Sequence, residues 1–226
     1  MGQAKGIRMT FDLDNLLSRV EGLDGLTRPF SDDEVEEVIK HLPSDRAPGP
    51  DGFTGLFLRK CWSVLKPDFM KLVTEFYEGK CILECLNTSL ITLIPKKLNP
   101  EFVGDFRPIS LTNTCLKFLT KLLANRLQKV ILKCIHHNQY GFLKCRSIQD
   151  CLAWCFEYIH QCKASKRPIV LLKMDFTKAF DTIEHDAILT ILKHKGFDDR
   201  WNGWVSNLLS SGSSTVLLNG VPGQHF

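Results

Sequence analysis

The chain has 226 residues, 44% of them hydrophobic, with a formal net charge of +4. This length and apolar content suffice for one large or two small globular domains with a real core. No stretch approaches the roughly 20 uncharged apolar residues of a membrane span, and the N-terminus lacks the apolar core of a secretory signal. We therefore expect an intracellular protein of the nucleus or cytoplasm with no membrane partner.

The nine cysteines are an odd number, scattered along a chain without an export signal. This pattern favours reduced thiols on helix faces over a disulfide framework. Cys81 with Cys85, and Cys151 with Cys155, lie one helical turn apart, a spacing that could hold a metal. Because no C-x-x-C pair accompanies them, packing is the favoured interpretation over a zinc site.

The positive charge is concentrated in one stretch of the chain. Residues 86–146 carry 10 basic and 2 acidic side chains, whereas residues 1–85 carry 11 and 15 and the remainder carries 8 of each. A surface that faces phosphate groups has such an excess. A solvated helix face is an equal alternative, because Lys117, Lys121 and Lys129 fall at helical spacing among leucines.

Capping residues and apolar periodicity predict the elements of the first half of the chain. Ser31 and Glu34 form a capping box, Pro67 suits the first turn of a helix, and the turn-rich segment 44–52 predicts a loop. The residues before Ser31 have weak periodicity and are expected to be weakly ordered. The expected elements are helices over 31–42, 55–65 and 67–78 and a strand over 89–95.

The second half begins with the most regular helical pattern, leucines spaced three and four apart over 116–130. Ser147, complemented by Asp150, predicts the start of another helix. The nearly continuous apolar run at 168–176 predicts a buried central strand. The remaining expected elements are a loop around Arg107 and Pro108, helices over 184–195 and 199–209, and a terminal hairpin that turns at Asn219 and Gly220.

Asp175 lies at the C-terminal end of the predicted central strand. A buried carboxylate is costly unless it is paired or binds a cation, so Asp175 is a candidate metal ligand. Its segment, KMDFTKAF, resembles palm motif A (D-x-x-x-A-F) of the reverse transcriptases of LINE-type (non-LTR) retrotransposons. The resemblance implies that Asp175 is the catalytic residue that binds Mg²⁺, that Phe176 adds its backbone carbonyl, and that Phe180 blocks a ribose 2′-OH. The structural alternative makes Asp175 a strand-end cap and Phe180 a core residue.

Upstream segments resemble the fingers of the same family. LITLIPKK followed by DFRPISL implies that Lys96 and Arg107 grip the triphosphate of the incoming nucleotide, which suits the chemistry of both side chains. APGPDGF, residues 47–53, is similar to the loop that opens LINE-type domains. It implies that Pro48 and Gly49 contact the template, although any surface turn could use these residues.

A further segment, QYGFLKCRSIQD at 139–150, resembles the fingers pattern Q-x-G-F-x-x-G-R-S-x-x-D. The resemblance implies that Gln139, Phe142 and Arg146 contact the template. Cys145 stands where the family has Gly, and it would strain the backbone if that position needs a positive φ. The four motifs occur in the family's order.

The residue pattern predicts an α+β fold with helices packed on a sheet. The resemblance makes it a right-hand polymerase with fingers and a partial palm on a small, incomplete antiparallel sheet. It also implies an RNA template, a DNA primer, a deoxynucleoside triphosphate (dNTP) and Mg²⁺ as substrates and cofactor. The expected regions are a weakly ordered segment at 1–30, a fingers-like region at 31–167 and a partial palm at 168–226.

Two-metal catalysis needs carboxylates from more than one strand. In the family these follow in a Gln-Gly-Asp-Pro segment and an F-A-D-D turn, which this sequence does not contain. GFDDR at 196–200 is not that turn, because its aspartates suit the N-cap of the next helix. We therefore expect a truncated reverse transcriptase domain with weak Mg²⁺ binding and no activity alone. The alternatives are a non-catalytic nucleic-acid-binding module and a helical interaction protein.

Overall fold

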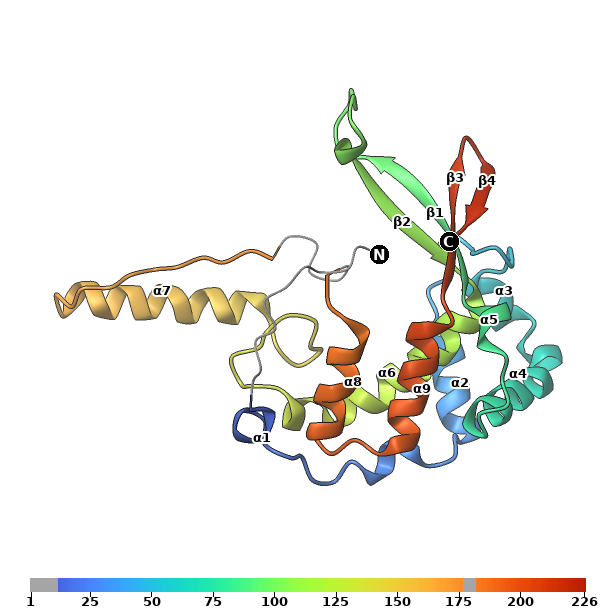
Figure 1. Cartoon of the computed structure of the whole chain (residues 1–226), viewed down its shortest axis with the longest axis horizontal. Helices are drawn as coiled ribbons and strands as arrows, with labels where there is room; N and C mark the ends of the chain where they lie inside the picture. The colour runs from blue at the N-terminus through green and yellow to red at the C-terminus, as the bar shows by residue number, and fades with distance from the viewer. Residues whose placement is uncertain (1–11, 177–181) are drawn as a thin grey trace. The chain divides into compact units, whose positions relative to one another are not determined.

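The computed structural model describes residues 12–176 and 182–226, and in that part it combines helices with one four-stranded sheet (Figure 1). The α+β prediction is confirmed. The helices are α1 (Leu13–Leu16), α2 (Asp32–His41), α3 (Gly55–Lys60), α4 (Trp62–Tyr77), α5 (Leu83–Leu86), α6 (Thr114–Cys134), α7 (Ile148–Ala164), α8 (His185–His194) and α9 (Asp199–Ser210), with 3-10 helices η1 (Asp24–Thr27) and η2 (Val103–Asp105). The strands are β1 (Thr88–Pro95), β2 (Phe106–Thr112), β3 (Ser213–Leu218) and β4 (Val221–His225).

The sheet has the order β2-β1-β3-β4 and is mixed, which corrects the expectation of an antiparallel sheet. β1 pairs antiparallel with β2 and parallel with β3, while β3 and β4 form an antiparallel hairpin. Parallel strands need a long crossover, and the helices between β2 and β3 supply one. The terminal hairpin turns at Asn219 (φ 50°) and Gly220 (φ 81°) as predicted, because both residues accept the left-handed backbone of its turn.

β2 corrects the expectation of a loop around Arg107 and Pro108. Proline cannot donate a ladder hydrogen bond, so it argues against a central strand, but β2 lies at the edge of the sheet where proline is tolerated. Strand β1 was predicted correctly. Its burial is intermediate from Thr88 to Leu93 and the last two residues are exposed.

Local capping signals place most helices where the sequence predicts them. Ser31 Oγ accepts from the Glu34 N–H at 3.3 Å and the Glu34 carboxylate accepts from the Ser31 N–H at 3.2 Å, which completes the capping box of α2. Ser147 caps α7 by accepting from the Gln149 N–H. The predicted start of α4 at Pro67 is wrong, because the break falls at Cys61 and the helix continues through the proline.

The chain divides into two compact units. The sheet unit comprises residues 24–126 and 199–226 and contains all four strands with α2–α5, α9 and most of α6. The helical unit comprises the described residues up to 23 together with 127–198, and it contains α1, α7, α8 and the end of α6.

Aromatic side chains form much of the core of the sheet unit. Phe69 of α4 meets Phe118 of α6 edge-on, with ring centroids 5.0 Å apart, and Phe76 stacks on Trp204 of α9 at 5.5 Å. Trp201, also on α9, is buried beside them. These contacts join three helices that lie far apart in the sequence. Edge-on and offset arrangements are the ones that aromatic pairs prefer.

Arg126 is buried in the sheet unit, with 4% of its surface exposed. Its guanidinium donates to the carbonyl oxygens of Leu26, Arg28 and Pro29, and to both carboxylate oxygens of Glu34 at 3.0 and 2.7 Å. It also lies over the ring of Phe30, 3.8 Å from the centroid. One cation thus satisfies three backbone acceptors and ties the segment before α2 to α6.

Replacing Arg126 with Met should lower the free energy of unfolding by about 3 kcal/mol, because the change removes the donor of three carbonyl groups and the cation that pairs with Glu34. Urea denaturation followed by circular dichroism measures this loss. The matched control is Lys129→Met, at an exposed position of the same helix, which should change stability by no more than about 0.5 kcal/mol. Equal stability of the two variants would contradict the anchoring role of Arg126.

The predicted central strand at 168–176 is wrong for the described structure. This segment has no regular secondary structure and its side chains are exposed, with Val170 at 94%. It runs back along α7 (Figure 1). Residues 167–171 line a pocket of about 870 Å³ together with Trp154 and Tyr158 of that helix. An apolar run acquires strand structure only where a partner strand satisfies its backbone, and none of the four described strands pairs with it.

Among the described residues, no helix is both long enough and apolar enough to cross a membrane.

All nine cysteines are free thiols: Cys134 and Cys162 are buried, and the other seven are partly or fully exposed. Burial raises the pKa of the Cys115 thiol, which favours its protonated form.

Candidate nucleotide and nucleic-acid interface

Lys96 and Arg107 both lie near the far end of the β1–β2 hairpin. This hairpin extends away from the helices of its unit (Figure 1). Arg107 pairs with Ile94, and the Lys96 N–H continues the ladder by donating to Asp105 O at 2.7 Å. Lys96 follows the last residue of β1, so it lies two positions along the chain from the partner of Arg107. Both side chains are exposed.

Asp105 holds the connection between these strands in place. Its carboxylate pairs with the Lys97 ammonium at 2.9 Å and accepts from the backbone N–H groups of Glu101 and Phe102. The Lys97 hydrogen bond, followed by the two backbone donors, lowers the pKa of Asp105 below its ordinary value. Asp105 thereby neutralises Lys97, while the Lys96 ammonium binds only the carbonyl oxygen of Gly104 among the described groups.

The loop at 47–53 is fixed to the junction between β2 and α6. The Asp51 carboxylate accepts from the N–H of Thr114, the first residue of α6, at 2.5 Å and from the N–H of Phe53 at 3.2 Å. The Asn113 side chain accepts from the Asp51 N–H and donates to Leu86 O and Thr88 Oγ1. Neither Asp51 nor Asn113 was singled out from the sequence, because the partners that join the loop to this junction lie more than 20 residues away.

Gly49 has a packing reason to be glycine. A Cβ atom at this position would lie 2.2 Å from the carbonyl oxygen of Thr112 and 2.7 Å from the Asn113 nitrogen. The turn closes through the Gly52 N–H, which donates to Gly49 O at 3.0 Å, and Gly52 has φ 71°. Close backbone approach therefore fixes Gly49 independently of any template.

Replacing Asp51 with Ala should lower the free energy of unfolding by about 1–2 kcal/mol, because the first N–H of α6 and the Phe53 N–H lose their acceptor. Thermal and urea unfolding measure the change. Asp45→Ala removes an exposed carboxylate from the same loop region and serves as the control. If both variants unfold alike, the Asp51 carboxylate does not stabilise this junction.

The segment at 139–146 is organised by Arg146 in the helical unit. Its guanidinium donates to His136 O at 2.8 Å and Gln139 O at 2.6 Å, so it closes the loop instead of projecting freely. Phe142 has φ 63° and is 88% exposed, an uncommon backbone conformation for a bulky residue. Cys145 is not among the residues with positive φ, so the expected strain at that position does not arise.

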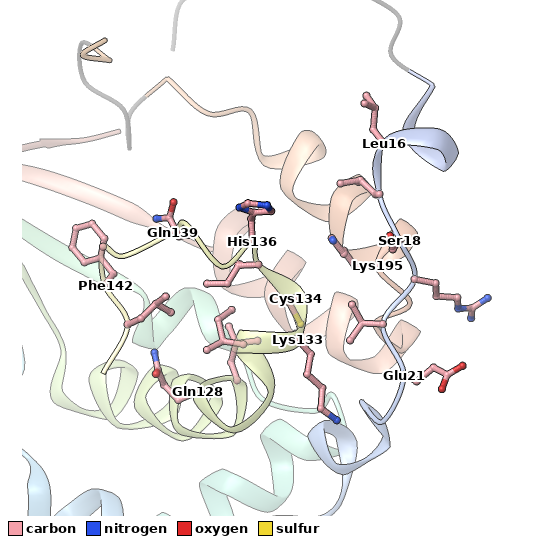
Figure 2. Close-up of a pocket in the computed structure, with 18 residues that line it drawn as sticks. Leu16, Ser18, Glu21, Gln128, Lys133, Cys134, His136, Gln139, Phe142 and Lys195 are labelled. Carbon is pink, nitrogen blue, oxygen red and sulfur yellow. The ribbon is translucent and has the colours of Figure 1, made fainter. Parts of the chain in front are cut away.

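Gln139 and Phe142 also line a pocket of about 1130 Å³ in the helical unit (Figure 2). Figure 2 shows these two residues and His136 on one side and the segment from Leu16 to Glu21 on the other. The end of α6 forms the floor and Lys195 adds a basic group. Arg146 does not line this pocket, so two of the three residues of this segment that were predicted to contact the template lie together there.

Asp175 lies in the helical unit, exposed on the segment that follows α7. Phe180 lies outside the described residues. Within residues 12–176 and 182–226, no three His, Cys, Asp or Glu side chains gather as they would to hold a metal ion. Among the described residues, Asp175 is therefore not joined by two further side chains of these types.

The basic stretch of residues 86–146 separates into structural and exposed charges. Arg126 is buried, Lys97 pairs with Asp105, and Arg146 binds backbone carbonyls. The exposed remainder includes Lys96 and Arg107. The two interpretations drawn from the sequence were a phosphate-facing surface and a solvated helix face. Neither of them describes all ten basic residues of this stretch.

The protein family described as reverse transcriptase (RNA-dependent DNA polymerase) matches residues 94–225, more than half of the chain. The chain therefore belongs to the reverse transcriptase family. Members of this family act on nucleic acids and generally use divalent metal ions. The family resemblance inferred from the four motifs is confirmed.

Within the family, the chain is related to proteins of non-LTR retrotransposons. It is 29% identical over 195 residues to the "Transposon TX1 uncharacterized 149 kDa protein" of Xenopus laevis, covering 86% of this chain and 15% of that protein. It is 29% identical over 182 residues to the Pol polyprotein of the R2 element of Nasonia vitripennis, covering 80% and 17%. It is 27% identical over 165 residues to the RNA-directed DNA polymerase from mobile element jockey of Drosophila melanogaster, covering 70% and 18%. The chain thus spans about a sixth of the length of these relatives.

Proposed function

We propose that this chain is the fingers and the beginning of the palm of a retrotransposon reverse transcriptase, and that Lys96 and Arg107 hold the triphosphate of the incoming dNTP. Residues 31–167 form the fingers-like region and residues 168–226 the beginning of the palm. RNA template and DNA primer are the other substrates. The observation that carries the proposal is the pairing of β1 with β2, which brings two exposed cations to the far end of one projecting hairpin.

The two cations have complementary chemistry for a triphosphate. The Arg107 guanidinium offers a planar fork of donors to two phosphate oxygens, whereas the Lys96 ammonium is a compact charge on a flexible stem. Asp105 forms its ion pair with the neighbouring Lys97, and among the described residues neither Lys96 nor Arg107 lies within ion-pair distance of a carboxylate. Because both groups are exposed, binding a phosphate requires little rearrangement of the chain.

The double variant Lys96→Gln, Arg107→Gln should weaken binding of dTTP to the chain by about 100-fold or more, since each lost charge-assisted hydrogen bond costs about 1.5–3 kcal/mol. Isothermal titration calorimetry in Mg²⁺ buffer measures the change. The control is Arg28→Gln with Lys71→Gln, two exposed cations of the same unit that lie outside the sheet. Equal weakening in the control would reduce the effect to net charge and refute the triphosphate site.

Asp175 would contribute one carboxylate to the metal site, Phe176 its backbone carbonyl, and Phe180 the contact with the sugar. Pro48, Gly49, Gln139, Phe142 and Arg146 would lie along the template strand. A pair of catalytic metals about 3.5–4 Å apart needs more carboxylates than the one at position 175. We therefore propose that the chain binds Mg²⁺ weakly and needs further carboxylates for catalysis.

In a primer-extension assay with an RNA template, a DNA primer, dNTPs and Mg²⁺, the purified chain should give no extended product. Asp175→Asn should give the same background, because one exposed carboxylate cannot support the two-metal reaction. Gel electrophoresis of a labelled primer resolves each added nucleotide. Templated products from the unmodified chain that disappear with Asp175→Asn would show instead that it assembles a complete metal site.

The second candidate function is non-catalytic binding of nucleic acid. It is favoured by a specific feature of the sheet unit, a pocket that combines basic and aromatic side chains. That pocket lies away from the end of the β1–β2 hairpin along β2, so the two sites can be tested separately.

A further inference from the structure

A pocket of about 560 Å³ opens in the sheet unit between the loop after α2, strand β2 and the first turns of α6. Its walls combine apolar and basic side chains, and none of its lining residues is acidic. Its volume lies within the range of about 300–1,000 Å³ that is typical of small-ligand sites. The aromatic, apolar and basic side chains of its lining include Arg46, Phe53, Ile109, Lys117 and Lys121.

Phe53 gives the pocket an exposed aromatic surface. Its ring stacks on Phe57 with centroids 4.8 Å apart and planes 18° from parallel, and Phe57 does not itself line the pocket. Phe53 remains 48% exposed and Ile109 remains 40% exposed. The backbone beneath the ring is fixed, because Phe53 O accepts from Thr114 Oγ1 at 2.6 Å. A rigidly held, open aromatic ring suits stacking of a flat heterocycle.

Three cations surround this apolar surface. Lys117 and Lys121 lie one turn apart on α6, and Arg46 lies on the opposing loop. The Lys117 ammonium donates to Ala47 O at 3.3 Å, and among the described residues none of the three cations pairs with a carboxylate. Lysines spaced along a helix can follow successive phosphates of a strand.

We propose that this pocket binds one unpaired nucleotide of a single-stranded RNA, with its base stacked on Phe53 and its flanking phosphates held by Lys117 and Lys121. The combination of a π-surface with unneutralised cations matches a nucleic acid strand, and a pocket of this width admits a base that is not paired. The assignment rests on the proposed function, which supplies RNA as the chemical class of the strand.

Fluorescence anisotropy with a labelled, unstructured RNA of about 12 nucleotides tests the stacking contact. Phe53→Ala should weaken binding about tenfold or more, and Phe53→Trp should keep it near the unmodified level. Phe226→Ala removes another exposed aromatic of the same unit and should leave affinity unchanged. Circular dichroism melts identify any variant that fails to fold, and in that case Phe53→Leu, which keeps an apolar side chain but no ring, replaces Phe53→Ala.

The phosphate contacts are tested by the salt dependence of the same titration. Lys117→Gln with Lys121→Gln should reduce the slope of log affinity against log salt by about 1.4, the value for two phosphate contacts on a single strand. Lys40→Gln with Lys71→Gln changes the net charge equally at two exposed positions outside the pocket. An equal reduction in both pairs would overturn the assignment of the phosphates to Lys117 and Lys121.

Further outcomes of these titrations decide the proposal. RNA binding that ignores Phe53→Ala, or a perfectly paired RNA duplex that binds as tightly as the single strand, would overturn the pocket. If the Lys96→Gln, Arg107→Gln variant loses dTTP binding but RNA binding does not change in Phe53→Ala, the pocket alone is refuted. If RNA binding depends on Phe53 but dTTP binding does not change in the Lys96→Gln, Arg107→Gln variant, the triphosphate site alone is refuted.

Discussion

The hydrogen bonds among Asp51, Asn113 and Thr114 are the constraint on which the candidate interface of the sheet unit depends. Through them the loop at 47–53, the start of β1 and the start of α6 share one set of buried polar partners. Asn113 and Thr114 are almost fully buried, so an unmet donor or acceptor there would cost free energy. The same junction holds the backbone of Phe53 and sets the end of β2 from which the hairpin extends. It therefore positions both the pocket and the hairpin cations.

Electrostatics in this protein is divided between anchoring and exposure. Arg126 and Arg146 use their guanidinium groups on backbone carbonyls, a structural use of arginine that draws on its fork of donors. Lys96, Arg107 and Lys121 stay exposed or partly exposed and unpaired with carboxylates among the described residues. A charge count along the sequence cannot separate these two uses, because it does not record which cation is buried. The unneutralised groups are the ones that can meet phosphate.

The sequence predicted the local elements well where a local signal existed. The capping box at Ser31 and Glu34 and the turn at Asn219 and Gly220 are confirmed, because capping and turn geometry involve residues within four positions. Prediction was wrong where pairing decides structure. β2 was missed because Pro108 argues against a strand until its edge position is known, and the apolar run at 168–176 has no partner strand among the described residues. The spacing of apolar residues indicates which side chains are buried. It does not indicate whether another strand satisfies the backbone hydrogen bonds of the segment.

By itself, the sequence determined the family, through four ordered motifs, and the position of most helices, through capping residues and apolar spacing. These are short-range properties, fixed by the chemistry of neighbouring residues. Only the tertiary structure decided that Lys96 and Arg107 lie at the same end of one hairpin, that Arg126 is buried, and that Phe53 and Lys117 line one pocket. Each of these depends on contacts between residues distant in the chain. Strand register, burial and hydrogen bonding set such contacts, and a linear pattern does not contain them.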